Sequence, residues 1–237
     1  MKVGDGIESA SSGWSFADSG VAEHFPEHAE RSIPGYRAGQ ELICELADFF
    51  VQRDGVQYEL GCATGELLRV LAERSAGKPE ARWIGIDNVP EMAAAAREHC
   101  AGLGTVEIRC EDIVAAELEP ADFIVAHYVM QFVQPRMRQA VFDKVYASLN
   151  WGGGFVLFEK VRGPDARFQD MLTTLYNAFK RRNGFSAEEI LNKTDALKSV
   201  LHPFSTQANL DLLRRAGFVD VVTVHKQLCF EGFLAIK

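Results

Sequence analysis

The sequence contains no apolar run of about 18 residues, the length that a helix needs to cross a bilayer. Its first residues, MKVGDGIESASSG, lack the hydrophobic core of a signal peptide. We therefore expect a soluble cytoplasmic protein without membrane contact. Positive charge is also scarce, because 25 Lys and Arg stand against 33 Asp and Glu, for a formal net charge of −8. This balance disfavours nucleic acid as a partner and favours a small molecule.

Cysteine motifs are missing as well. The five cysteines are odd in number and scattered, with neither a C-x-x-C pair nor a Cys/His spacing typical of a metal site. We interpret them as reduced thiols that pack as small apolar side chains, and we expect no metal centre.

What the 237 residues do contain, at 47% hydrophobic, is enough apolar material for one large α/β domain. From Gln57 to Lys160, strand-like and helix-like segments alternate, and a strand pair follows at the C-terminus. This pattern predicts a Rossmann-like, doubly wound sheet of seven mostly parallel strands. We expect disorder in residues 1–12 and a single domain over 13–237, with a lid and helix in 13–52 and an inserted helical pair in 161–205.

A glycine-marked turn, Gly61-Cys62-Ala63-Thr64-Gly65, follows the first strand of this pattern. A dinucleotide fingerprint needs a second glycine where Ala63 stands, because bare backbone must approach the pyrophosphate. A phosphate loop needs a Lys after its last glycine, but Glu66 follows Gly65. An acidic neighbour suits a ligand that is positively charged, so both phosphate sites are disfavoured.

S-adenosylmethionine (SAM) is such a ligand, since it combines adenosine with a cationic sulfonium and has no phosphate. Glu59 precedes the turn and could orient the loop and its ligand. Asp87 ends the second strand, where a carboxylate can hold both ribose hydroxyls. Asp112 ends the third strand, where it can accept from the adenine amino group while Ile113 covers the ring. The alternative for Asp87 and Asp112 is a purely structural role as a helix N-cap.

At this point the chain resembles the class I SAM-dependent methyltransferases, and within them the carboxy-SAM synthase branch of the tRNA wobble-uridine pathway. The similarity extends from about residue 14 to the C-terminus. The glycine turn is common to the whole class, whereas "RSIPGY" and "FKRRNGFS" are specific to the branch. Members of the branch are homodimers, so the resemblance also implies a homodimer.

Residue by residue, the resemblance places a set of side chains around SAM or its product S-adenosylhomocysteine. From the methionine end to the adenine, these are Tyr36, Gly61, Cys62, Ala63, His127, Asp87, Asn88, Asp112 and Ile113.

Two departures from the branch concern the added carboxyl group. His127 occupies the position of an Asn, and Thr194 occupies the position of the Arg that neutralises this carboxylate. An unpaired buried carboxylate costs several kcal/mol, so the loss of this Arg predicts weak binding of the carboxylated form. Lys193 is not expected to compensate, because the family has a Lys there as well. We expect no other cation to wait in the site.

The acceptor side is predicted from residues near the carboxyl ends of the later strands. His127 is the candidate general base or acceptor-orienting group, and Tyr128 shares its neighbourhood. The alternative for His127 is a buried neutral ring that is satisfied by backbone. An aromatic N-terminal lid would exclude water from the sulfonium. The residues expected to line the acceptor are Trp14, Phe16, Tyr128, Gln131, Glu159, Tyr176 and His202.

Three functions remain open at the level of the sequence. The first, and the one that we expect because the Arg is missing, is methyl transfer from SAM to a nitrogen, oxygen or carbon of a small molecule, for example in specialised metabolism. The second is carboxy-SAM synthesis from prephenate, which would serve tRNA modification indirectly. The third is a SAM-binding partner protein that has no catalytic activity.

Overall fold

The structure, a computed structural model, describes residues 2–8, 13–18 and 20–237. Within these residues, seven strands form one sheet in the order β5-β4-β3-β6-β7-β9-β8. The strands from β5 to β7 are parallel, whereas β9 runs antiparallel to both β7 and β8. The predicted seven-stranded, mostly parallel sheet is therefore confirmed. Its strands are β3 (Val56–Leu60), β4 (Arg82–Asp87), β5 (Val106–Cys110), β6 (Ala121–His127), β7 (Leu149–Lys160), β8 (Asp220–Gln227) and β9 (Phe230–Ile236).

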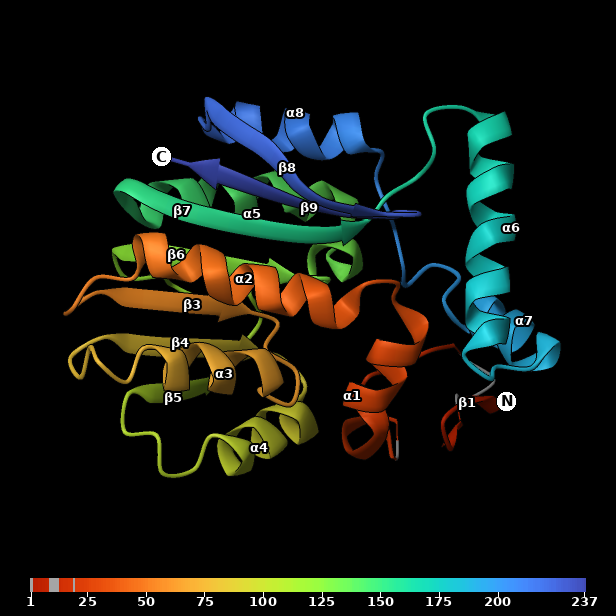
Figure 1. The fold of residues 1–237 in the computed structure, drawn as a ribbon, viewed down its shortest axis with the longest axis horizontal. Coiled ribbons are helices and arrows are strands. Elements are labelled where there is room, and N and C mark those ends of the chain that lie inside the picture. The colour runs from red at the N-terminus through yellow and green to blue at the C-terminus, as the bar shows by residue number, and fades with distance from the viewer. Residues whose placement is uncertain (1, 9–12, 19) are drawn as a thin grey trace.

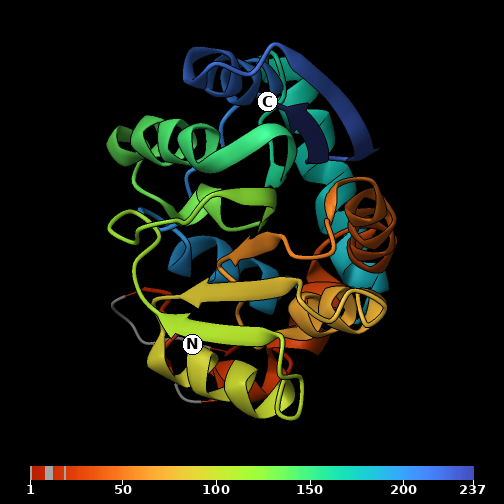
Figure 2. The ribbon, with the colours of Figure 1, turned by 90° about the vertical axis from the view of Figure 1, so that its left-hand side faces the viewer.

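Helices cover both faces of the sheet (Figure 2). On one face lie α2, α3 and α4, and on the other lie α5 and α8. The helices are α1 (Val21–Ser32), α2 (Tyr36–Phe50), α3 (Glu66–Arg74), α4 (Pro90–His99), α5 (Pro135–Ser148), α6 (Ala166–Arg182), α7 (Ala187–Ala196) and α8 (Thr206–Ala216), with a short 3-10 helix η1 (Met130–Phe132) after β6.

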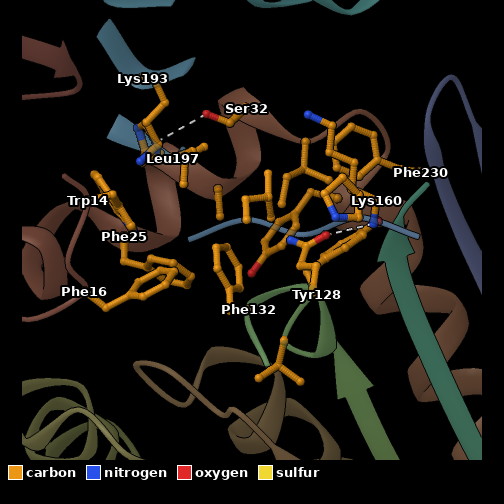
Figure 3. Close-up of a pocket in the computed structure, with 18 of the residues that line it drawn as sticks. Trp14, Phe16, Phe25, Ser32, Tyr128, Phe132, Lys160, Lys193, Leu197 and Phe230 are labelled. Atoms are coloured by element: carbon orange, nitrogen blue, oxygen red, sulfur yellow. Dashed lines mark hydrogen bonds between the residues drawn. The ribbon is translucent and has the colours of Figure 1, made fainter. Parts of the chain in front are cut away.

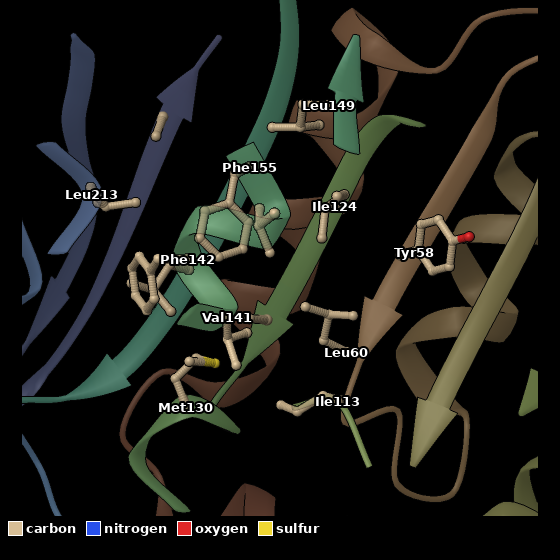
Figure 4. Packing of buried hydrophobic residues seen from close by; sticks show 14 of the residues in the cluster. Tyr58, Leu60, Ile113, Ile124, Met130, Val141, Phe142, Leu149, Phe155 and Leu213 are labelled. Carbon is tan, nitrogen blue, oxygen red and sulfur yellow. The ribbon is translucent and has the colours of Figure 1, made fainter. Parts of the chain in front are cut away.

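The core on the α5 side shows how the sequence pattern produces this layer (Figure 4). Val141 and Phe142 of α5 and Leu213 of α8 pack towards Ile124 and Phe155 of the sheet, and all five are almost fully buried. Burying each such side chain contributes about 1.5–3 kcal/mol. Apolar residues that repeat every 3.6 positions give each helix one apolar face, and this face packs against the apolar strands of the sheet.

The predicted helical pair after β7 is α6 and α7, which stand beyond the carboxyl ends of the parallel strands together with α1 (Figure 1). Asp165 caps α6 by accepting from the Phe168 N–H, and Ser186 and Glu189 form a capping box at the start of α7. The two caps fix where α6 and α7 begin. Both helices interrupt the alternation of strands and helices and lie beyond the carboxyl ends of the parallel strands.

The N-terminus differs from the predicted disorder. Two short strands, β1 (Lys2–Gly4) and β2 (Ile7–Glu8), pair as an antiparallel hairpin that packs against α7. Val3 and Ile7 are buried, and between them Asp5 and Gly6 adopt positive φ angles of 53° and 74°. An Asp-Gly pair is a strong hairpin signal, so the sequence contained the cue. Residues 1 and 9–12 of the predicted segment lie outside the described residues.

Candidate functional site

A cavity of about 1410 Å³ opens at the carboxyl ends of β3, β4, β6 and β7, under α1, α6 and α7. Its walls combine the glycine turn, the tip of β4, the N-terminal aromatic residues and the inserted helices (Figure 3). Pockets for one drug-sized ligand usually measure about 300–1,000 Å³. The cavity therefore has room for a nucleoside cofactor and a second small molecule.

The glycine turn forms one wall and brings its backbone close to the cavity. Gly61 has a φ of 71°, and a Cβ at this position would clash with Val129. The backbone N–H groups of Gly61 and Cys62 both donate to the Ile86 carbonyl, at 2.7 and 3.0 Å, which ties the turn to β4. Only a glycine fits at Gly61, so the turn offers bare backbone to a ligand.

Asp87 lies beside this turn at the tip of β4. Its Oδ2 accepts from the Ala63 N–H at 2.9 Å, and its Oδ1 accepts from the Val89 N–H at 3.0 Å. Burial raises the pKa of the carboxyl, while these two N–H groups act in the opposite direction. Each carboxylate oxygen keeps a further lone pair, so Asp87 could also accept two hydroxyl groups in the cavity.

Glu59 forms the floor of the cavity, on β3 just before the turn. Its carboxyl is buried, and its Oε2 has no hydrogen-bond partner among the described residues. Burial, together with the nearby charge of Asp87, raises the pKa of Glu59 well above its usual range. A buried carboxyl without a full set of partners favours a positively charged ligand, because a cation would stabilise its ionised form.

Several aromatic side chains surround His127 at the end of β6. The imidazole lies 5.1 Å from the Tyr36 ring, 4.5 Å from Tyr128 and 5.4 Å from Phe158, measured between centroids. Burial lowers the pKa of His127 to about 3, and the charge of His225 adds to this. His127 is therefore neutral at physiological pH, and its buried Nε2 has no described partner.

The lid predicted from the N-terminal aromatic residues lies on the opposite wall. The Phe16 ring contacts Trp14, Phe25 and Phe132 in edge-to-face arrangements, at centroid distances of 5.6, 6.2 and 4.9 Å. Figure 3 shows this aromatic cluster across the cavity from Tyr128 and Phe230. These rings line this end of the cavity with apolar surface.

Four lysines also line the cavity, and they contradict our expectation that no cation waits there: Lys160, Lys180 and Lys193, which lie over aromatic rings, and the exposed Lys198, which pairs with Asp195. Lys160 and Lys180 lie over the Tyr176 ring, with Nζ at 4.5 and 4.4 Å from its centroid, and Lys193 lies over the Trp14 ring. Lys180 is buried and Lys160 and Lys193 are half-buried, and none of these three forms a salt bridge to a described acidic residue. The tertiary fold alone brings them together, from β7, α6 and α7.

Comparisons with known proteins decide the family. A family model described as "Methyltransferase domain" matches residues 58–153. The carboxy-S-adenosyl-L-methionine synthase of Actinobacillus succinogenes is 36% identical over 223 residues, which cover 93% of this chain and 92% of that protein. The synthase of Klebsiella pneumoniae is 37% identical, over 93% of this chain and 87% of the relative. This chain belongs to the carboxy-S-adenosyl-L-methionine synthase family.

Solved structures of methyltransferases share the fold of this family member at low sequence identity. Human N-acetylserotonin methyltransferase in complex with SAM superposes with a TM-score of 0.62 at 16% identity, over 94% of this chain and 57% of that one. An N-methyltransferase from Bradyrhizobium japonicum in complex with S-adenosyl-L-homocysteine gives 0.57 at 18%, over 86% and 88%. The predicted fold, the methyltransferase family and its SAM cofactor are thus confirmed.

Most of the residues that the sequence analysis selected as site residues line this one cavity. Those that line it are Trp14, Phe16, Tyr36, Glu59, Gly61, Cys62, Ala63, Asp87, Asn88, His127, Tyr128, Gln131, Tyr176, His202 and Thr194. The assignment of each to cofactor or second substrate stays a prediction.

Four predicted residues lie outside the cavity lining: Gly65, Asp112, Ile113 and Glu159. Gly65, with a φ of 81°, precedes α3 and lies against Ala96. Asp112 is exposed and its Oδ1 accepts from the Val114 N–H at 2.8 Å within a turn, and no described helix follows for it to cap before β6, so its contact with the adenine stays a prediction. Glu159 is fully buried behind the cavity wall.

No group of three or more His, Cys, Asp or Glu is arranged for a metal ion within the part of the chain that the structure describes. The five cysteines are all free, with Cys110 exposed and the others buried. Among the described helices, none is both long enough and apolar enough to span a bilayer.

Proposed function

We propose that the protein makes carboxy-SAM from SAM and an anionic carboxyl donor, which the family resemblance identifies as prephenate. Two lines of support favour this function over simple methyl transfer. The first is the similarity to carboxy-SAM synthases along 93% of the chain. The second, on which the proposal mainly depends, is the group formed by Lys160, Lys180 and Lys193 in the cavity.

The lysines support an anionic second substrate because none of them forms a salt bridge among the described residues, although Asp5 and Asp18 partly oppose the effect of burial on Lys193. Burial lowers the pKa of Lys180 to about 8, helped by the nearby charge of Lys160. Burial, again followed by a neighbouring lysine, lowers the pKa of Lys193 to about 6. A bound dicarboxylate such as prephenate would reverse this by stabilising the protonated amines. The carboxyl group of the product could use the same lysines, so the loss of one Arg at Thr194 does not leave it unpaired.

The remaining residues have roles that follow from their chemistry. SAM supplies a methyl carbon activated by the sulfonium. In this reaction the methyl carbon would give up a proton and bond to the CO₂ that prephenate loses, together with hydroxide, as it becomes phenylpyruvate. The proton and the hydroxide would end as water. Neutral His127, with a free Nε2, is the candidate acceptor of that proton. Glu59 and Asp87 are the candidate anionic contacts to the cationic and ribose parts of SAM. The aromatic lid of Trp14, Phe16 and Phe25 would exclude water from the reacting carbon.

Methyl transfer to a small molecule is the second candidate. It is favoured by Thr194, whose Oγ1 donates back to the Ile190 carbonyl at 2.8 Å within α7. The hydroxyl proton is thus already used within the helix, and Thr194 lacks the positive charge with which an Arg would bind a carboxylate. A lower affinity for the carboxylated form would leave ordinary SAM as the preferred ligand.

Mass spectrometry of the nucleoside products distinguishes these candidates. The protein is incubated with SAM, with and without prephenate, and the nucleosides are separated. We expect a product heavier than SAM by one carboxyl group that forms only with prephenate, and Lys160→Met to lose it while the exposed Arg182→Met retains it. S-adenosylhomocysteine formed with another metabolite pool would instead favour methyl transfer. Tight SAM binding without turnover in any pool would leave the non-catalytic function.

The family resemblance also supports a homodimer. Light scattering coupled to size-exclusion chromatography should give twice the 26.3 kDa of one chain; a single-chain mass would contradict this.

A further inference from the structure

We propose that Arg138 is the positioning residue that holds Gln131 and His202 in the half of the cavity that takes the second substrate. Glu159 interacts electrostatically with Arg138. Neither Arg138 nor Glu159 lines the cavity. Arg138 is nevertheless completely buried. Removing a charged guanidinium from water costs free energy, so other interactions must compensate for its burial.

The guanidinium of Arg138 binds three carbonyl oxygens from two separate segments. Its Nε donates to the Val133 carbonyl at 3.0 Å. Its Nη2 donates to the Gln131 carbonyl at 3.1 Å and to the His202 carbonyl at 2.6 Å. A planar group with donors in a fixed fork suits this arrangement, whereas an ammonium on a flexible stem would not satisfy all three carbonyls with the same geometry.

These contacts join two walls of the cavity. Gln131 belongs to η1 after β6, and His202 belongs to the segment that follows α7. The His202 N–H also donates to the Gln131 carbonyl at 2.9 Å, so the two residues are linked directly as well. On its other side, the Gln131 Oε1 accepts from the Lys160 N–H at 2.9 Å. One buried side chain thus braces both residues beside a cavity lysine.

Glu159 is a buried acidic group whose protonation is coupled to that of Arg138. It ends β7 directly before Lys160, and its charge favours the protonated state of Arg138 against the effect of burial. In return, Arg138 opposes the burial that raises the pKa of Glu159 to about 8. The Phe204 ring covers the guanidinium, with its centroid 4.2 Å from Cζ. Hydrogen bonds and packing therefore hold Arg138 in one orientation.

The inference deepens the proposed function in one respect, since it requires a second substrate beside SAM. It predicts a division of effects: the glycine turn and Asp87, which Arg138 does not touch, should hold the nucleoside as before. Loss of Arg138 should weaken only the second-substrate half. A purely structural role would instead lower stability and impair both halves together.

The test compares Arg138→Met and Arg138→Lys with Arg136→Met, an exposed arginine of the same helix. Binding of S-adenosylhomocysteine is measured by calorimetry, prephenate KM and kcat by product formation, and backbone hydrogen exchange by mass spectrometry. For Arg138→Met we expect unchanged affinity for S-adenosylhomocysteine, a KM raised about tenfold or more through lost buried hydrogen bonds, and faster exchange in residues 199–204. Arg138→Lys should recover part of the KM, and Arg136→Met should resemble the wild type.

Unchanged exchange in residues 199–204 would overturn the inference, as would equal losses in nucleoside affinity and KM. Should Arg138→Met not fold, Arg138→Lys supplies the same comparison. If prephenate is no substrate at all, the proposed function fails, but hydrogen exchange and nucleoside binding still decide whether Arg138 positions the two walls.

Discussion

Replacing Lys193 by Met should stabilise the ligand-free protein, because loss of contact with water disfavours the charged ammonium and no described acidic side chain forms a salt bridge to it. Its pKa is lowered from 10.5 to about 6, so at pH 7 folding removes the proton from most Lys193 side chains. This removal costs about 4–5 kcal/mol, at 1.36 kcal/mol for each pH unit between 7 and 10.5. Relaxation and water penetration reduce such costs, so we expect a gain of about 2–4 kcal/mol.

The pH dependence follows from the same shift. The folded-state pKa is depressed for a base, so between pH 6 and 10.5 the unfolded chain holds a proton that the folded chain lacks. The stability of the wild type should therefore rise with pH through this window, at up to about 1.4 kcal/mol per unit from Lys193. The advantage of Lys193→Met should shrink correspondingly as pH rises.

Urea unfolding at pH 6 to 9 measures both effects, and at pH 7 thermal unfolding should shift upwards by roughly 5–15 °C. The matched control is Lys198→Met, whose side chain is 74% exposed and pairs with Asp195 at the surface. We expect it to change stability by less than about 0.5 kcal/mol. Equal stability of Lys193→Met and the wild type, with the same pH slope, would refute the argument that Lys193 is held buried for an anionic ligand.

Two further predictions concern the nucleoside half and the proton acceptor. Asp87→Asn should weaken S-adenosylhomocysteine binding at least about tenfold in calorimetry, because an amide cannot accept from both the Ala63 and Val89 N–H groups; Asp143→Asn, at an exposed site, should not, and equal affinities would remove Asp87 from the site. His127→Phe should bind the nucleoside normally but turn over more slowly, and the wild-type pH–rate profile should show no inflection near pH 6.5, since the pKa of His127 is about 3. Full activity of His127→Phe would show that the imidazole accepts no proton.

Local signals in the sequence were sufficient for the sheet and the nucleoside half of the site. Gly61 and Asp87 follow directly from a strand and its turn, and the carboxyl ends of parallel strands necessarily meet at one edge. Asp112 shows the limit of that reasoning, because the sequence alone cannot tell whether a carboxylate after a strand serves a ligand, a helix N-cap or a turn. Its exposure and its bond to Val114 are visible only in the fold.

The opposite half of the cavity was decided by the tertiary structure. Lys160, Lys180 and Lys193 come from three elements whose mutual placement depends on how α6 and α7 pack beyond the sheet, and each lysine alone reads as an ordinary solvated side chain. The same holds for Arg138, whose partners lie 5, 7 and 64 residues away. Periodicity and turn chemistry are properties of neighbouring residues, so the sequence determined the fold class and its cofactor. Burial and charge pairing depend on residues far apart in the chain, so only the folded molecule determined where the cations gather.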